Sequence, residues 1–279
     1  MMNKTTLILL TCAFMAWIAP ASAQSPLGAK NCQFDYFQQS TLVRCIEDGD
    51  TSYMRSSFQA MWPITLNGKE CSKLQKELSK SITGKDDIHQ LDQVVNYLLY
   101  TDAEGVSFDS MNQCRLIADD NTVDGWRMDI INSELDLKSL SDRFATFHMF
   151  DYAYFAGAAH GLEADTYLTF DLNLNKVVTF EDVVADPEAL RPAILQSIKE
   201  AYNNTLEVTL SEDGLPPLSS NFYFGNGALH IVYLPYEICG YAQGIIDVTV
   251  YPYLLGDEIN LSALTPYGII LMKDSSNYK

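Results

Sequence analysis

Several stretches of the chain alternate apolar and polar residues with a period of two, which is typical of a half-buried β-strand. The clearest lies within residues 244–251, where Ile246, Val248 and Val250 alternate with Asp247 and Thr249. Further predicted strands cover residues 51–62, 126–138, 144–155, 167–172, 176–180, 221–224 and 228–234. The phase of the alternation slips at Ile130-Ile131, which predicts a β-bulge there.

A second pattern, with apolar residues three or four positions apart, predicts helices over residues 69–81, 87–100 and from Pro187 to Tyr202. The last begins with Asp186 as N-cap and a proline at the first helical position. Thr179 and Asp182 resemble a capping box that starts a short turn over residues 181–184. We therefore expect an α+β fold: antiparallel sheets with helices packed on one face, in two closely associated subdomains over residues 24–163 and 164–279.

The first 23 residues predict a cleaved signal peptide. Lys4 precedes an apolar stretch from Leu7 to Ile18, and Ala21-Ser22-Ala23 offers the small residues that a signal peptidase reads. A retained membrane anchor is the less favoured alternative, because a spanning helix needs about 20 apolar residues. Cys12 lacks the setting of a lipoprotein cysteine. The expected location is periplasmic or secreted, with no membrane-spanning segment in the mature chain.

Charge narrows the choice of partner. The chain has 18 Lys and Arg against 36 Asp and Glu, a formal net charge of −18. Nucleic acids and anionic membrane surfaces require a basic face, so neither is an expected partner. A cationic partner would be attracted. The alternative is that acidity only keeps an exported protein soluble.

Five cysteines follow the predicted signal peptide: Cys32, Cys45, Cys71, Cys114 and Cys239. In an oxidising compartment they predict one or two disulfides, and their odd number leaves at least one thiol. The pairing cannot be deduced from the sequence. No C-x-x-C motif or zinc-finger spacing is present, so a redox motif or a structural zinc site is not expected.

No motif commits the chain to a reaction. A G-x-S-x-G elbow, a P-loop and a dinucleotide fingerprint are absent from the sequence. His148, Asp151 and His160 lack the spacing of a compact metal site, so we predict no metal and no cofactor. Acidic pairs such as Glu181-Asp182 leave a glycan hydrolase as a less favoured alternative.

Two loops carry the candidate binding residues. His160 lies in a run of small residues, 157–161, where the chain can turn sharply; the alternative is a structural histidine hydrogen-bonded to the main chain. Tyr236, Glu237 and Tyr241 follow an apolar strand and could present aromatic rings to a sugar or a protein. Glu237 could equally cap the sheet by accepting main-chain hydrogen bonds.

These loops also carry a family resemblance. Residues 155–161 are similar to a Tyr-x-Gly-Gly-Ala-His-Gly motif, residues 169–183 to the hairpin and turn that follow it, and residues 221–224, 234–244 and 250–253 to a closing signature. Together they resemble the extracytoplasmic region of RsiV, the lysozyme-sensing anti-sigma factor, and the accessory domain of the peptidoglycan deacetylase PdaC. Phe155, Ala158 and Cys239 depart from the pattern.

The resemblance implies a two-part α+β module without known catalysis, which in RsiV binds lysozyme. Neither a sigma-binding segment nor a deacetylase domain is recognisable here, so we expect neither of those activities. The prediction is an exported, non-catalytic binding module of the bacterial cell envelope whose partner is a cationic, lysozyme-like protein. Peptidoglycan or another glycan is the alternative ligand.

Overall fold

The computed structural model describes residues 31–254, except residues 103, 119–122, 124–126, 185, 226–227 and 252–253. The predicted signal peptide therefore lies outside the described residues, as do Trp126 of one predicted strand and Pro252-Tyr253 of the closing signature. No helix within the described part is long and apolar enough to cross a membrane.

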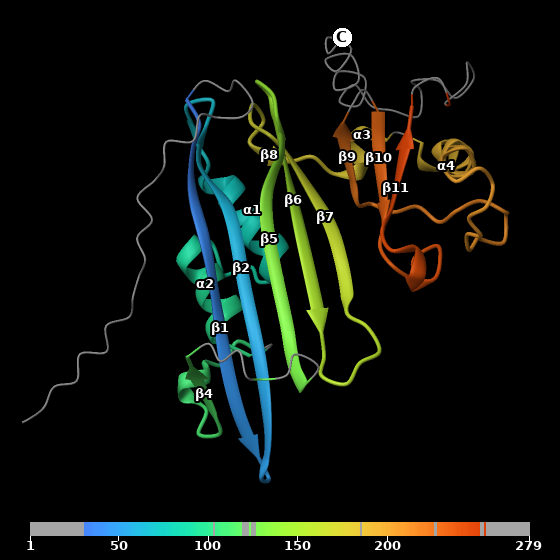
Figure 1. Cartoon of the computed structure of the whole chain (residues 1–279). Coiled ribbons are helices and arrows are strands. Elements are labelled where there is room, and N and C mark those ends of the chain that lie inside the picture. The colour runs from blue at the N-terminus through green and yellow to red at the C-terminus, as the bar shows by residue number, and fades with distance from the viewer. Residues whose placement is uncertain are drawn as a thin grey trace, which may run out of the picture.

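A large twisted sheet forms the first half of the structure (Figure 1). Its strands run in the order β4-β1-β2-β5-β6-β7-β8, and the short β3 pairs with β2. Their bounds are β1 (Gln33–Glu47), β2 (Asp50–Leu66), β3 (Lys69–Glu70), β4 (Cys114–Ile117), β5 (Met128–Leu140), β6 (Phe144–Tyr154), β7 (Leu162–Asp171) and β8 (Lys176–Val177). Neighbouring strands are antiparallel except β2 and β5, which are parallel.

Helices α1 (Ser72–Thr83) and α2 (Leu91–Tyr100) cover one face of this sheet, with the short 3-10 helix η1 (Phe108–Ser110) after them (Figure 1). Leu74 and Leu78 of α1 are fully buried against the sheet core, which includes Trp62 and Phe147. Burying these apolar side chains is the main stabilising contribution. The other face carries exposed polar side chains, among them Gln38, Gln59 and Glu134 on adjacent strands.

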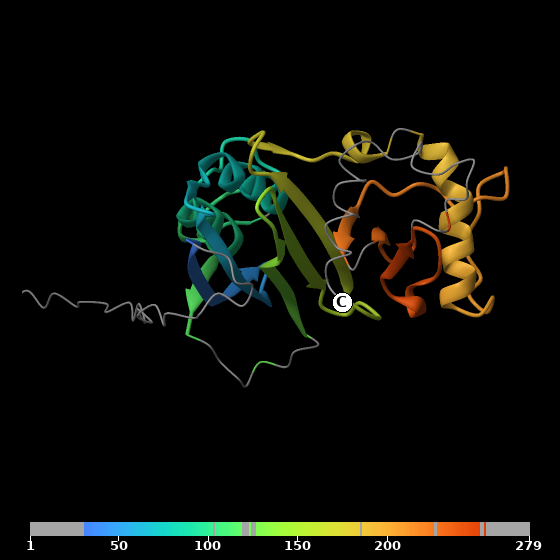
Figure 2. The same cartoon turned by 90° about the horizontal axis from the view of Figure 1, so that it is seen from above.

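A smaller sheet, of order β11-β10-β9, forms the second half (Figure 2). Its strands are β9 (Phe222–Gly225), β10 (Ala228–Tyr233) and β11 (Ile246–Val250), with the 3-10 helix η3 (Tyr241–Gln243) before β11. Helices α3 (Phe180–Val183) and α4 (Pro187–Ala201) complete its core. Asp186 caps α4 by accepting a hydrogen bond from Ala189 N, as predicted, and Leu190, Ile194 and Ile198 are buried.

The α+β class is confirmed, with specific corrections. The bulge predicted at Ile130-Ile131 is wrong: the register shift in β5 lies between Leu137 and Ser139. Strand β1 was not predicted. The first two helices begin later than predicted, at Ser72 and Leu91. The first does so because Lys69–Glu70 pairs with β2 as β3. The large sheet also continues to Val177, beyond the division predicted after residue 163.

One disulfide joins Cys45 to Cys114, directly opposite each other on β1 and β4. Cys32, Cys71 and Cys239 are free thiols. Burial raises the pKa of the Cys71 thiol to about 11, so its reactive thiolate is scarce at neutral pH. The disulfide ties the edge strand β4 to the rest of the large sheet.

Candidate binding site

Three of the predicted site residues meet. His160, in the loop between β6 and β7, stacks on Tyr241 of η3 with ring centroids 3.6 Å apart and an interplanar angle of 16°. The hydroxyl of Tyr236 lies 3.2 Å from His160 Nε2. His160 Nδ1 lies 2.8 Å from the carbonyl oxygen of Gly161 and donates to it, which leaves Nε2 to accept from Tyr236. We call His160, Tyr236 and Tyr241 the aromatic cluster.

The aromatic cluster faces solvent. His160 is exposed, Tyr236 is 59% exposed, and Tyr241 is half-buried beneath the histidine ring. Phe155 and Leu162, at either end of the same β6–β7 connection, are 55% and 50% exposed. Exposed aromatic side chains gathered in this way are typical of a surface that contacts a ligand or another protein.

The backbone conformation of residues 234–237 explains how Tyr236 is presented. Tyr236 has a φ of 73°, an uncommon left-handed conformation for a side chain other than glycine. The turn is closed by Glu237, whose amide donates to Leu234 O and whose carboxylate accepts from Leu234 N at 2.7 Å. Glu237 thus holds the turn that presents Tyr236, which is the capping role considered from the sequence. Among the described contacts, none joins the Glu237 side chain to the aromatic cluster.

Gly161 provides a test of the β6–β7 loop. A methyl group added to its Cα would lie 2.5 Å from the end of the Tyr152 ring. We expect Gly161→Ala to lower the free energy of unfolding by about 1 kcal/mol, because the ring must move. Urea denaturation measures the change. Ala159 is exposed, so the free energy of unfolding of Ala159→Ser should stay within about 0.5 kcal/mol of that of the original chain. Equal stability of the two variants would contradict the packing described.

A separate column of stacked rings joins the two sheets. His148 stacks on Tyr167, Tyr167 on Tyr223, and Tyr223 on His230, with centroids 4.9, 4.3 and 4.3 Å apart. The four residues come from β6, β7, β9 and β10 in turn. Lys138 Nζ lies 4.9 Å from the centroid of the Tyr223 ring, a cation–π distance.

Two carboxylates hold this column. Asp165 Oδ1 lies 2.7 Å from His148 Nε2, and Asp247 contacts both the Tyr223 hydroxyl at 2.6 Å and His230 Nδ1 at 2.8 Å. Burial, and then the charges of Asp165 and Asp247, raise the pKa of Tyr167 to about 12. The tyrosines therefore stay neutral and stacked at physiological pH. The column thus connects β6 and β7 of the large sheet to β9 and β10 of the small sheet.

The column was not predicted. Its members lie within predicted strands, and alternation shows only that Tyr223 or Asp247 faces one side of a strand, not which distant residue it meets. His148 and Asp151, considered together as metal ligands, have different partners: Asp165 for the histidine and Ser133 for the carboxylate. No group of three or more metal-ligating side chains that could hold an ion occurs within the described residues.

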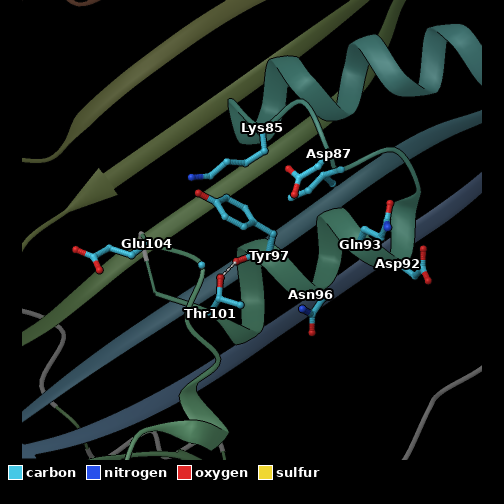
Figure 3. Close-up of a pocket in the computed structure, with 10 residues that line it drawn as sticks. Lys85, Asp87, Asp92, Gln93, Asn96, Tyr97, Thr101 and Glu104 are labelled. Carbon is cyan, nitrogen blue, oxygen red and sulfur yellow. Dashed lines mark hydrogen bonds between the residues drawn. The ribbon is translucent and has the colours of Figure 1, made fainter.

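An open hollow of about 710 Å³ lies elsewhere, around Tyr97 on α2 (Figure 3). Lys85 Nζ is 5.6 Å from the centroid of the Tyr97 ring, and Thr101 donates to the Tyr97 carbonyl oxygen. Asp92 and Asn96 are spread along α2 rather than converging on one point (Figure 3). A ligand site normally combines apolar walls with a few convergent polar groups, so this solvated hollow is a weaker candidate than the aromatic cluster.

Comparison with known proteins supports the fold assignment. Residues 181–252 match DUF3298, a family described as "Protein of unknown function". A solved structure of a DUF3298 family member from Bacteroides fragilis superposes with a TM-score of 0.64 at 17% identity, covering 88% of this chain and 99% of that one. A DUF3298 family protein from Pseudomonas aeruginosa gives a TM-score of 0.56 at 11% identity, over 86% and 97% of the two chains. No curated protein matches the chain.

Proposed function

We propose that this chain is an exported, non-catalytic binding module of the bacterial cell envelope and that its partner is a cationic, lysozyme-like protein. The observation that carries the proposal is the exposed aromatic cluster, which two loops from different sheets build together. The stacked column joins the two sheets from which those loops extend. A site that is formed before its partner arrives loses less conformational entropy on binding.

The chemistry of the surface favours a protein partner that carries positive charge. Tyrosine is enriched among the residues that contribute most to protein–protein binding, because it combines a large apolar ring with a polar hydroxyl. The net charge of −18 would accelerate encounter with a cation. The resemblance to the lysozyme-binding region of RsiV includes both loops of the aromatic cluster and points to the same class of partner.

Titration calorimetry with a c-type lysozyme tests the proposal. We expect measurable heat at low ionic strength and an affinity that falls as salt is added, because the charges of the two proteins are opposite and exposed charges are screened. Absence of heat together with undiminished lysozyme activity at low salt would reject this partner.

The same purified chain should be tested on cell-wall sacculi. The 59% exposed ring of Tyr236 could also stack on a sugar, so retention on sacculi without any lysozyme binding would favour the alternative of a glycan ligand. Release of soluble muropeptides from the sacculi would contradict a non-catalytic role.

A further inference from the structure

The outer edge of β7 offers backbone groups for pairing. In an antiparallel pair, residues alternate between those whose N–H and C=O point to the partner strand and those whose groups point away. Val178 N donates to Thr169 O and Tyr167 N donates to the side chain of Asn221, so Thr169 and Tyr167 point away from β6. By the same alternation, Glu163 and Asp165 also point outward.

A side-chain amide already occupies part of this edge. Asn221, just before β9, accepts from Tyr167 N at 3.1 Å and donates to Asp165 O at 2.6 Å. The Asn221 side chain thus makes the two hydrogen bonds that the main chain of a neighbouring strand would make with Tyr167 and Asp165. Within the described residues, the N–H groups of Glu163 and Asp165 donate no such bond and the C=O of Glu163 accepts none. Among the described residues, the edge is thus capped at Tyr167 and unpaired towards Leu162.

The unpaired segment of β7, residues 162–165, lies between Asn221 and the aromatic cluster. At one end is Asn221, and at the other is the aromatic cluster, because Leu162 follows His160 by two residues. Gly244, which ends η3, approaches the Glu163 carboxylate so closely that an added Cβ would lie 3.5 Å from Oε1. The edge at Glu163 therefore lies beside η3, which carries Tyr241 of the aromatic cluster.

The side chains of the segment are acidic. Glu163 and Asp165 pair with Tyr152 and Phe150 of β6, on the sheet face opposite to that of Phe147 and Met149, which pack in the helix-covered core. Glu134 and Asp136 are exposed on the same face of β5, where they pair with Phe150 and His148. A basic side chain projecting over this face from an added strand would meet carboxylates and aromatic rings, both of which attract cations.

We propose that the β7 edge at residues 162–165 binds a short, extended and basic polypeptide segment by strand addition. The N–H and C=O of Glu163 and the N–H of Asp165 supply the pairing, and the Glu163 carboxylate selects for lysine or arginine in the ligand. This inference deepens the proposed function, since it specifies the kind of segment that the cationic partner presents. It does not depend on that partner being a lysozyme.

A peptide tests the inference without the partner protein. The probe is a capped hexapeptide that alternates lysine and valine, added to the isotope-labelled mature chain and followed by amide resonances. We expect the signals of Glu163 and Asp165 to shift most, and their hydrogen exchange to slow at least about tenfold at saturation. No binding at millimolar peptide, or binding that leaves these two amides unchanged, would overturn the proposal.

Two substitutions separate backbone pairing from charge. Glu163→Pro removes the outward N–H and is compatible with an edge strand, whereas Glu163→Gln removes the charge and keeps the N–H. We expect peptide affinity to fall at least about tenfold in the proline variant and no more than about threefold in the glutamine variant. Equal losses in both variants, or no loss in either, would overturn strand addition.

If the proline variant fails to fold, the exchange measurement on the original chain decides alone. Calorimetry with lysozyme is a separate readout, so failure of the proposed function and failure of this inference are distinguishable.

Discussion

Replacing Asp171 with asparagine should lower the free energy of unfolding by about 3 kcal/mol at pH 7, because it breaks a buried ion pair. The Asp171 side chain is completely buried at the end of β7. Its carboxylate accepts from Arg143 Nε at 2.9 Å and Nη2 at 2.8 Å, and from the amides of Asn173 and Leu174 at 2.9 and 3.0 Å. Asparagine can still accept from the two amides but removes the negative charge that pairs with the Arg143 guanidinium.

The effect should depend on pH in a defined direction. Burial raises the pKa of Asp171, but the hydrogen bonds from Arg143 and the amides of Leu174 and Asn173 outweigh it and hold the pKa below its ordinary value. A carboxyl whose folded pKa is lowered stabilises the fold above its unfolded pKa of about 4, and this contribution is lost as the pH falls through the folded value. The two chains should therefore differ most at neutral pH and converge in acid.

Urea denaturation at several pH values measures both effects. Asp136→Asn is the matched control, because Asp136 is exposed on the open face of β5, and it should change stability by no more than about 0.5 kcal/mol. Equal stability of Asp171→Asn and the original chain at pH 7 would contradict the account, as would a stability difference that does not shrink as the pH is lowered.

Removing the Cys45–Cys114 disulfide should cost about 4 kcal/mol of unfolding free energy, the value expected when a loop of this length is no longer closed in the unfolded chain. The two cysteines are 69 residues apart in sequence, and they join β1 to the edge strand β4. The variant is the double replacement Cys45→Ser with Cys114→Ser, compared with Cys32→Ser, which removes a free, half-buried thiol. A loss below about 1 kcal/mol in the double variant would show that the bridge contributes little.

Much of the fold follows from local patterns. The helix after Asp186 and the strand that contains Ile246 and Val248 were predicted because capping and alternation are properties of neighbouring residues. Strand β1 was missed because its middle, Gln38 to Thr41, is uniformly polar and shows no alternation. Pairing along the whole of β2 makes this segment a strand, and that partner is not visible in its own sequence.

The candidate site, too, depends on contacts between distant residues that local sequence patterns do not reveal. His160, Tyr236 and Tyr241 were proposed from their positions in loops rich in small or aromatic residues. Their contact joins residues 76 positions apart, which no local pattern predicts. The turn role of Glu237 could be considered from the sequence because it involves Leu234, only three residues away. The column from His148 to His230 depends on how two sheets meet and was not foreseen.

The central claim is that the aromatic cluster is the binding surface. It is tested most directly by titrating a c-type lysozyme into the original chain and into Tyr236→Gly. Glycine suits the left-handed backbone at this position, so the substitution removes the ring without straining the turn. Tyr36→Ala is the control, because Tyr36 on β1 is also 59% exposed but lies outside the cluster.

We predict that Tyr236→Gly weakens lysozyme binding at least about tenfold, the loss typical of an important interface tyrosine, and that Tyr36→Ala leaves it unchanged. Equal affinity of the original chain and Tyr236→Gly, or no binding by the original chain at low salt, would contradict the account.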